Sequence, residues 1–407
     1  MDTVTPRQRW LAILGIGEEG VEGLTPVSRG LIEAASLVVG GARHLALADS
    51  IIHGERLSWP SPLTEAFPTI LAYRGLPVVV LATGDPYCYG IGTTLGRIVP
   101  LEQTLCIPAP SAFSLACARL GWARQDVATV SFCGRPLETI RPLLQPGARI
   151  LALSADDTTP GAVAGLLQRT GFGPSVMHIL EALGGPCERI RTTTAPALPD
   201  DISQLNLLGI EVASGPDARI MPLAPGIADE WFEHDGQITK REIRAITLSA
   251  LAPHRGDLLW DIGCGSGSIA VEWSLCHPTN RAVAIEARPD RAARAARNAL
   301  AFGVPELRII TGEAPAALAD LPTPDAVFVG GGGHDARVLD VAWAALRRGG
   351  RIVINAVTLE TAALLIALHQ QRGGTLTRLS VEPTENIGRM RAFRPSLPIT
   401  QWAGVKP

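Results

Sequence analysis

Short apolar runs alternate along this chain with longer segments in which apolar residues recur every three or four positions. Pro77–Ala82 and Arg149–Leu153 have the length and composition of strands, whereas Ser111–Leu120 and Pro160–Thr170 have helical spacing. The other strands predicted in the first half are Trp10–Leu14, Leu37–Val39, Thr104–Ile107, Ser175–Leu180 and Asn206–Val212. This alternation is typical of βα units, and it predicts an α/β fold built on open parallel sheets.

The pattern breaks near the middle of the chain and then starts again. The break contains three prolines and a glycine without a regular period: Pro216, Pro222, Pro225 and Gly226. Beyond it, a predicted helix at Lys240–Ala252 precedes a predicted strand at Asp257–Trp260. A chain of 407 residues is also too long for one ordinary core. We therefore expect one domain at residues 1–215, a linker at 216–229 and a second domain at 230–407.

The composition narrows the class of protein. Hydrophobic residues make up 46% of the chain and charged residues 18%, which indicates a compact globular protein. A net charge of −3 gives no general attraction to nucleic acid, and no apolar run is long enough to span a membrane. The seven cysteines form no CxxC pair and have no histidine at zinc-ligand spacing, so we expect no metal site. The N-terminus has no long apolar run behind a basic start, so we expect no signal peptide and a cytoplasmic protein.

The second half contains a glycine-rich loop directly after a predicted strand. Its sequence is Asp261-Ile-Gly263-Cys264-Gly265-Ser266-Gly267, and a predicted helix follows from Ser268. Glycines at every second position let the backbone pass close to a ligand and expose N–H groups at a helix N-terminus. A dinucleotide fingerprint spaces its glycines as G-x-G-x-x-G instead. We expect Asp261 either to orient this loop or to meet an ammonium group.

Each of the next four predicted strands also ends in polar or glycine-rich sequence. These strands and the residues after them are Ala282–Ile285 with Glu286, Leu307–Ile310 with Glu313-Ala314, Ala326–Val329 with Gly330–Gly333, and Gly350–Ile354 with Asn355. Open α/β sheets bind ligands at the carboxyl ends of their strands. The pattern therefore predicts a nucleoside site, with Glu286 accepting both ribose hydroxyls and Glu313-Ala314 beside the base.

The first half has weaker signals of the same kind. Gly15-Ile-Gly17-Glu-Glu-Gly20 matches G-x-G-x-x-G, but Thr25-Pro26 delays the helix and the second strand runs into Gly40 instead of an acid. This context argues against nicotinamide binding. Thr83-Gly84-Asp85-Pro86 follows an apolar strand and is either a ligand-presenting turn or a plain turn. Ser111 has the position of a helix N-cap.

Four motifs of the first half, in their order along the chain, resemble the tetrapyrrole (corrin/porphyrin) methylase family. They are Gly15-x-Gly17, Thr83-Gly84-Asp85-Pro86, Pro108-Ala109-Pro-Ser111-Ala112 and Phe132-Cys-Gly134-Arg135. That family usually has glycine where Thr83 and Ala109 stand here. Residues 233–244, ahead of the Asp261 loop, resemble the decarboxylating precorrin methylase domain. The two resemblances imply a tetrapyrrole methylase domain of two α/β subdomains, followed by a Rossmann-like class I methyltransferase domain.

The resemblance further implies chemistry on a precorrin, a tetrapyrrole, with one S-adenosyl-L-methionine per domain. The N-terminal domain would methylate meso carbon 5. The C-terminal domain would methylate carbon 15 and remove carbon dioxide from the ring C acetate. The implied cofactor residues are Thr83, Gly84, Asp85, Ser111 and Ala112 in the first domain, and Thr239, Asp261, Gly263, Cys264, Gly265, Ser266, Gly267, Glu286 and Ala314 in the second.

Methyl transfer to an enamine-like meso carbon requires positioning and desolvation, and no metal or covalent nucleophile. Decarboxylation requires an electron sink after ring protonation, so His334 and Glu313 are candidate general acids, with a solvated loop position as the alternative. Candidate contacts to substrate carboxylates are Lys240, Arg241, Arg244, Arg389 and Arg391, with a solvated charged face as the alternative.

Two other functions stay open at this stage. One is an RNA methyltransferase with an accessory domain, which the acidic balance and the lack of a basic, aromatic-rich stretch disfavour. The other is an N-terminal half that has lost catalysis and serves as a docking module. We also expect a homo-oligomer, because methylases of both types often assemble.

Overall fold

The computed structural model describes residues 9–407 and divides the chain into two compact units. The N-terminal unit runs to Arg135 and continues at Gln145–Arg219, and the C-terminal unit comprises Pro136–Leu144 and Ile220–Pro407. The domain limits at residues 215 and 230 stay predictions. The expectation of no signal peptide concerns the start of the chain, where residues 1–8 lie outside the described part.

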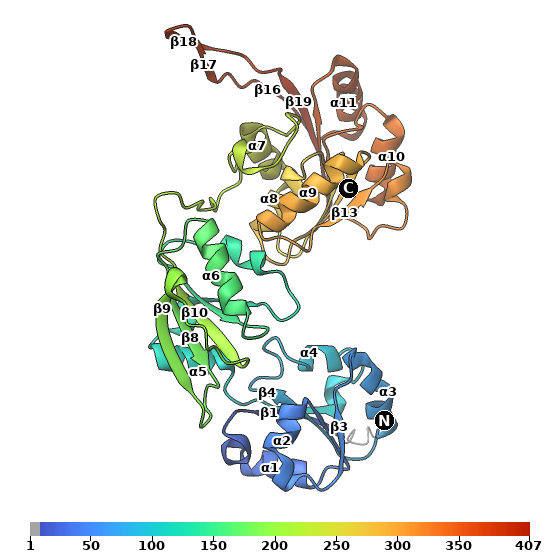
Figure 1. Ribbon diagram of the computed structural model, residues 1–407. Coiled ribbons are helices and arrows are strands. Elements are labelled where there is room, and N and C mark those ends of the chain that lie inside the picture. Colours follow the sequence, from blue (N-terminus) through green and yellow to red (C-terminus); the bar gives the residue numbers. More distant parts are fainter. Residues whose placement is uncertain (1–8) are drawn as a thin grey trace, which may run out of the picture. The chain divides into compact units, whose positions relative to one another are not determined.

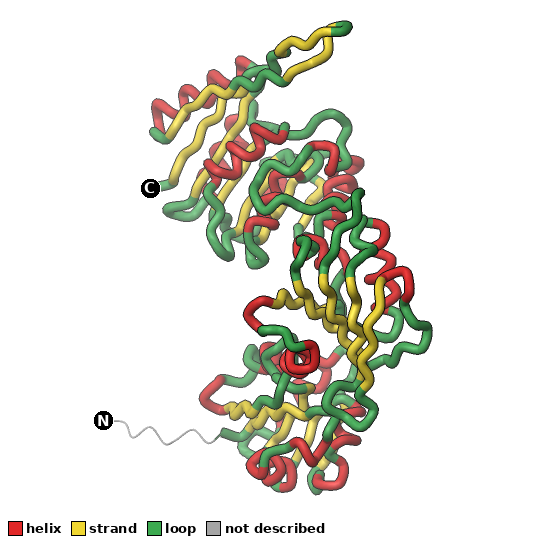
Figure 2. Tube along the Cα trace, turned by 90° about the vertical axis from the view of Figure 1, so that its left-hand side faces the viewer, coloured by secondary structure: helices red, strands yellow, loops and turns green. Residues whose placement is uncertain are grey.

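The N-terminal unit begins with a parallel five-stranded sheet (Figures 1 and 2). Its order is β3-β2-β4-β1-β5, with β1 at Leu11–Ile16, β2 at Leu37–Gly40, β3 at Glu55–Ser58, β4 at Val78–Thr83 and β5 at Thr104–Ile107. Helices cover both faces because most strand residues are apolar on both sides. On one face lie α1 (Pro26–Glu33) and α2 (Ala42–Leu47), and on the other lie α3 (Phe67–Ala72) and α4 (Gly92–Leu95).

The second sheet of the N-terminal unit is mixed, so the prediction of a parallel sheet is wrong here. Its order is β6-β7-β10-β8-β9, with β6 at Val127–Ser131, β7 at Arg149–Leu153, β8 at Val176–Glu181, β9 at Arg189–Thr194 and β10 at Asn206–Glu211. Only β6 and β7 pair in parallel. The connection from β8 to β9 is too short for a parallel crossover, which requires a dozen or more residues. Helix α5 (Ala112–Leu120) packs on this sheet, and α6 spans Thr159–Arg169.

The C-terminal unit is a doubly wound sheet of order β13-β12-β11-β14-β15-β19-β16. Its strands are β11 (Leu258–Ile262), β12 (Arg281–Glu286), β13 (Arg308–Thr311), β14 (Ala326–Val329), β15 (Arg351–Ala356), β16 (Thr375–Leu379) and β19 (Ile399–Val405). The first five strands of this order are parallel, and β19 runs antiparallel between β15 and β16. The strand order reverses between β11 and β14, the point at which such sheets bind ligands. The Rossmann-like prediction is confirmed.

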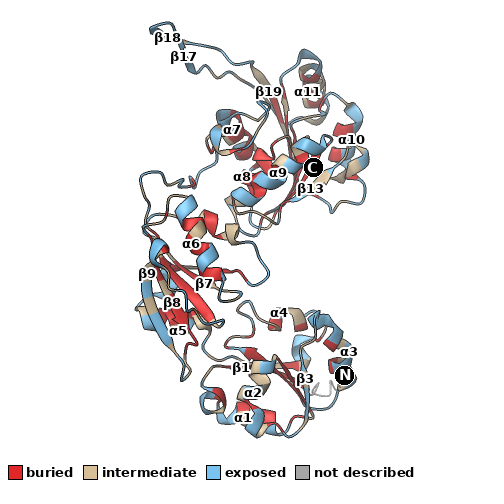
Figure 3. Ribbon diagram, viewed as in Figure 1, coloured by how far each residue is buried: buried red, intermediate tan, exposed pale blue. Residues whose placement is uncertain are grey.

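Helices cover both faces of this sheet, and the buried residues concentrate on its strands (Figure 3). One face packs against α7 (Arg241–Leu251), α8 (Ser268–Cys276) and α9 (Pro289–Ala301), and the other against α10 (Ala336–Ala345) and α11 (Leu359–Arg372). A hairpin of β17 (Thr384–Ile387) and β18 (Met390–Phe393) extends away from the sheet and is largely exposed (Figure 3). With both faces covered, the loops at the carboxyl ends of the parallel strands remain to form a site.

Candidate cofactor and substrate sites

The glycine-rich loop after β11 adopts a backbone that only glycine accepts easily. Gly263, Gly265 and Gly267 have φ angles of +70°, +56° and +75°. A Cβ atom at Gly263 would lie 2.5 Å from the Cα atom of Gly331, so this loop touches the glycine-rich segment after β14. The two loops form one wall of a cavity of about 780 Å³ at the carboxyl ends of the parallel strands. This volume is in the usual range for a small-molecule site.

Glu286 joins this loop to the end of β12. One carboxylate oxygen accepts a hydrogen bond from the Gly265 amide at 2.9 Å, and the other accepts one from the Arg288 amide at 3.0 Å. Each oxygen can accept a further hydrogen bond, because a carboxylate offers about four lone-pair positions. Glu286 also lines the cavity. A carboxylate that is held by backbone and open to a ligand suits the predicted contact to ribose hydroxyls.

Asp261 lies beneath the loop and does not contribute to the cavity wall. Its side chain is fully buried and accepts a hydrogen bond from the Ala270 amide in the first turn of α8 at 3.1 Å. Burial raises the pKa of this carboxyl to about 7. Of the two roles expected from the sequence, this geometry suits orientation of the loop and of α8. Ser266 and Gly267 also lie outside the cavity wall, whereas Cys264 lines it.

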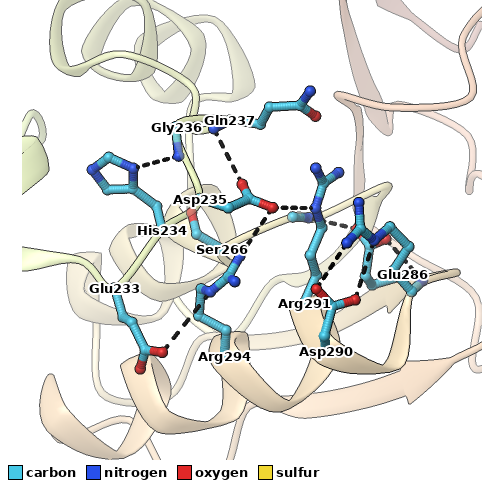
Figure 4. A network of polar contacts seen from close by, with 12 residues as sticks. Glu233, His234, Asp235, Gly236, Gln237, Ser266, Glu286, Asp290, Arg291 and Arg294 are labelled. Carbon is cyan, nitrogen blue, oxygen red and sulfur yellow. Dashed lines mark hydrogen bonds and ion pairs between the residues drawn. The ribbon is translucent and has the colours of Figure 1, made fainter.

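Residues 233–240, here called the strap, pass over the glycine-rich loop and are fixed to α9 by ion pairs (Figure 4). Asp235 binds Arg291 at 2.8 Å and Arg294 at 3.2 Å, and these contacts hold the pKa of its carboxyl well below the usual range. Glu233 pairs with Arg297 through both carboxylate oxygens. The strap thereby carries its last five residues, among them Thr239 and Lys240, to the cavity wall.

The structure brings most of the other predicted residues of the second half to the same cavity. Glu313, Ala314 and His334 line it together with the strap. The hairpin residues Arg389 and Arg391 are exposed and do not belong to its wall. The structure therefore brings the cofactor candidates and the two acid candidates together, and leaves the hairpin arginines apart from them.

Arg244 requires a correction, because its guanidinium does not face a ligand. The side chain is fully buried, and its donors bind Glu272, Asp229, and the carbonyl oxygens of Thr239 and Ile227. Arg244 lies on the inner face of α7, where an unpaired charge would be very costly. The predicted contact to substrate carboxylates is therefore wrong for this residue. It instead ties the segment before α7 to α8.

The N-terminal unit has its own cavity of about 370 Å³, lined by residues of both of its sheets. All five predicted residues line it: Thr83, Gly84, Asp85, Ser111 and Ala112. Gly84 has a φ angle of +54°, and a Cβ atom there would lie 2.7 Å from the Pro110 carbonyl oxygen. Ser111 caps α5 by accepting a hydrogen bond from the Ser114 amide at 3.1 Å, as predicted.

The glycines of the first G-x-G motif serve close packing in this unit. A Cβ atom at Gly15 would lie 1.9 Å from the Gly84 carbonyl oxygen and 2.4 Å from the Ala109 nitrogen. The Ala109 amide donates a hydrogen bond to the same Gly84 oxygen at 3.0 Å. The loops after β4 and β5 therefore meet at Gly15 near the end of β1, which accounts for this glycine without a dinucleotide.

Sequence reasoning missed three polar residues of the N-terminal cavity, Glu18, Arg43 and His44. Arg43 pairs with Glu18 and donates to the Thr83 hydroxyl at 2.9 Å, and the His44 Nε2 atom lies 2.8 Å from the same hydroxyl. Burial and the Arg43 charge lower the pKa of His44 to about 4, so this imidazole is neutral at pH 7. The available signal was their place shortly after β1 (Glu18) and β2 (Arg43 and His44), at the carboxyl edge of the sheet.

Within residues 9–407, no group of three or more His, Cys, Asp or Glu side chains is arranged to hold a metal ion. In the same part of the chain, no helix has both the length and the apolar character needed to cross a membrane. The two cavities are therefore the candidate functional sites of the described residues.

Family models match both halves of the chain. The model of the tetrapyrrole (corrin/porphyrin) methylases matches residues 11–199, and that of the precorrin methyltransferase domain matches residues 230–406. Both resemblances predicted from the motifs are thereby confirmed.

Named relatives match either nearly the whole chain or about half of it. A Pyrobaculum calidifontis protein named probable cobalt-precorrin-6B C(15)-methyltransferase (decarboxylating) is 36% identical over 188 residues, 44% of this chain and 96% of the relative. A Salmonella typhimurium protein named cobalt-precorrin-7 C(5)-methyltransferase is 32% identical over 191 residues, 47% of this chain and 94% of the relative. A Sinorhizobium protein named precorrin-6Y C(5,15)-methyltransferase (decarboxylating) is 52% identical over 398 residues, 98% of this chain and 96% of the relative. This chain therefore belongs to the family of precorrin-6Y C(5,15)-methyltransferases (decarboxylating).

Proposed function

We propose that this enzyme methylates precorrin-6B (precorrin-6Y) at carbons 5 and 15 and decarboxylates its ring C acetate at carbon 12, giving precorrin-8X in cobalamin biosynthesis. The N-terminal domain, residues 1–215, would methylate carbon 5. The C-terminal domain, residues 230–407, would methylate carbon 15 and release carbon dioxide. The names of the two half-length relatives support this division, because one names carbon 5 and the other carbon 15 with decarboxylation.

The observation that carries the proposal is the presence of a separate cavity in each unit, both at the carboxyl ends of parallel strands. In each cavity, glycines with positive φ let neighbouring loops approach closely. We infer one S-adenosyl-L-methionine per domain, which supplies the transferable methyl group when bound. A single cofactor site would leave the N-terminal half as a docking module.

In the C-terminal cavity, we assign cofactor binding to Thr239, Glu286, Ala314 and residues 263–265. The glycine-rich loop would present backbone N–H groups, and Glu286 would accept the ribose hydroxyls. The strap would exclude water from the space between cofactor and substrate, which assists methyl transfer to carbon. Asp261 would act through the loop that it orients.

Decarboxylation requires a proton donor, and His334 and Glu313 are the candidates on the same cavity wall. We assign the contact to a substrate carboxylate to Lys240, because it also lines this cavity and its side chain stays 56% exposed beside Asp229, which lies 3.7 Å away. Arg389 and Arg391 stay candidates at the outer edge of the substrate. Replacement of Arg389 or Arg391 by alanine should raise KM, and unchanged kinetics for both variants would overturn this contact.

In the N-terminal cavity, the proposed cofactor contacts are Thr83, Gly84, Asp85, Ser111 and Ala112. The Thr83 hydroxyl is held by Arg43, so it has a fixed position at the end of β4. Methylation of an enamine-like carbon requires this half to orient two ligands and keep them dry. Assembly as a homo-oligomer and a cytoplasmic location are further predictions.

The test is mass spectrometry of the precorrin after incubation with the full chain and methyl-labelled S-adenosyl-L-methionine. The proposal expects two added methyl groups and the loss of one carbon dioxide. One added methyl group at carbon 15 would identify the N-terminal half as a docking module. An unchanged mass, with cofactor binding intact, would overturn the precorrin substrate.

A further inference from the structure

Three polar side chains form a hydrogen-bonded network between α7 and the sheet of the C-terminal unit. The Asn355 side chain on β15 donates from Nδ2 to the Thr247 hydroxyl on α7 at 2.9 Å. Gln401 on β19 donates from Nε2 to the same hydroxyl at 3.2 Å and to Asn355 Oδ1 at 2.9 Å. Asn355 and Gln401 are directly opposite each other in the antiparallel β15–β19 pair. Their side chains therefore share one face of the sheet.

Apolar residues surround this network on the same face. Val353, two residues before Asn355, belongs to one buried cluster with Leu248 and Leu251 of α7. Thr247 is fully buried and Gln401 is 4% exposed. Buried polar groups are unfavourable unless they are hydrogen-bonded. Apolar residues of similar size would pack equally well between α7 and the sheet. Packing of α7 on the sheet therefore does not account for three polar residues.

Asn355 is the member of the network that lines the cavity. Its carboxamide has two N–H groups and two oxygen lone pairs, and the network uses one of each. One N–H and one lone pair remain for a ligand. The two buried partners fix the plane of the amide, so Asn355 presents these groups in one orientation.

The strand order places Asn355 away from the proposed cofactor residues. The glycine-rich loop, Glu286 and Ala314 follow β11, β12 and β13, which lie on one side of β14. Asn355 lies near the end of β15, on the other side of β14, and the cavity wall next to β15 and β19 contains Val357, Ser396, Leu397 and Ile399. This part of the wall is mainly apolar, and Asn355 adds one amide held in place by its two buried partners. Such a wall suits a flat macrocycle whose central polar atoms are ring nitrogens.

We propose that Asn355 is a substrate-binding residue of the C-terminal half, whose Oδ1 atom accepts a hydrogen bond from a ring N–H of the tetrapyrrole. Thr247 and Gln401 are positioning residues that act through Asn355. The inference rests on the proposed function and adds to it the polar contact that orients the macrocycle. An amide oxygen at a ring N–H also favours the protonated ring that accepts electrons when the acetate leaves.

The test uses the full chain with four variants and measures methylation at carbon 15, carbon dioxide release, and cofactor affinity by calorimetry. Asn355→Leu removes the contact and should lower kcat/KM for the precorrin about tenfold, with cofactor affinity unchanged. Asn355→Asp keeps an acceptor oxygen and should retain more activity than Asn355→Leu. Thr247→Val should lower kcat/KM, and Thr247→Ser should restore most of it because the hydroxyl acceptor returns.

Thr323→Val, at an exposed position before β14 and outside the cavity wall, is the control for a threonine-to-valine change. Asn355→Asp less active than Asn355→Leu would overturn the ring N–H contact. Equal kcat/KM for wild type and Asn355→Leu would overturn the inference alone, as would a fall explained by weaker cofactor binding. A wild-type chain that leaves the precorrin unchanged would overturn the proposed function, and the inference with it.

Discussion

Burial of one carboxyl group, that of Asp261, links the stability of the C-terminal unit to pH. Its pKa is raised from 3.8 to about 7 because the side chain is fully buried. The folded state therefore holds this proton more tightly than the unfolded state does. The resulting stabilisation is complete below pH 3.8 and is lost as pH rises through about 7. Asp261→Asn keeps an oxygen acceptor for the Ala270 amide and should remove this contribution.

The measurement is the free energy of unfolding of the ligand-free protein, from urea titrations between pH 4 and pH 8. Relative to wild type, Asp261→Asn should gain stability toward high pH, by a few kcal/mol at most. Glu306→Gln removes an exposed carboxyl of the same unit and is the control for a general charge effect. A constant difference between wild type and Asp261→Asn at all pH values would contradict the prediction.

The burial of the Arg244 guanidinium leads to a second prediction at the scale of single residues. Arg244→Ala would leave Glu272, which is 2% exposed, without its charged partner. Loss of one member of a buried ion pair destabilises a protein by about 3–5 kcal/mol. Arg241→Ala, at an exposed position of the same helix, should change stability by less than about 0.5 kcal/mol. Chemical denaturation of both variants checks this, and an equal effect would argue against the buried pair.

At the scale of elements, most strands could be predicted from their apolar runs, whereas polar edge strands could not. The predicted limits of β5, β7 and β14 agree with the structure, because each is an apolar run ended by turn residues. The strands β9, β17 and β18 were missed because β9 and β17 are mostly polar, and β17 and β18 form a mostly exposed hairpin. Their places depend on pairing between distant segments, which local sequence does not encode.

The same contrast explains the site residues. Glu286 and Glu313 were predicted because they follow apolar strands, and the carboxyl ends of parallel strands meet at one edge. Arg244 was misassigned because a charged residue in a helix normally faces solvent, whereas here its partner Glu272 lies on another helix. Arg43 and His44 were missed because their proximity to Thr83 depends on strand order.

The ion pairs that fix the strap to α9 lead to a prediction at the scale of elements. Asp235→Asn removes the charge that binds Arg291 and Arg294, so the strap should open more often and bind the cofactor more weakly. We expect about a threefold to tenfold loss of affinity in the C-terminal site, and a smaller loss at high salt because salt already screens these pairs. Calorimetry gives the affinity, and hydrogen exchange at residues 233–240 reports the opening.

Asp290→Asn is the matched control for the strap, because Asp290 pairs with Arg288 at the exposed start of the same helix. It should leave both cofactor affinity and exchange of the strap near the wild-type values. Faster exchange in Asp235→Asn without weaker binding would show that the strap does not cover the cofactor.

At the scale of the whole molecule, two cavities in two units predict two independent cofactor sites. Calorimetry of the wild-type chain should give two molecules of S-adenosyl-L-methionine, or of its demethylated product, per chain. Gly84→Val should abolish only the N-terminal site, because a side chain there meets the Pro110 carbonyl and requires a strained positive φ. Glu286→Ala should weaken only the C-terminal site, by about tenfold to a hundredfold, because a charged hydrogen-bond acceptor is lost. Each variant alone should approach one site per chain, and the double variant should bind almost none. One site in the wild type that Glu286→Ala removes would instead assign all methyl transfer to the C-terminal half, and the N-terminal cavity would then require a different ligand.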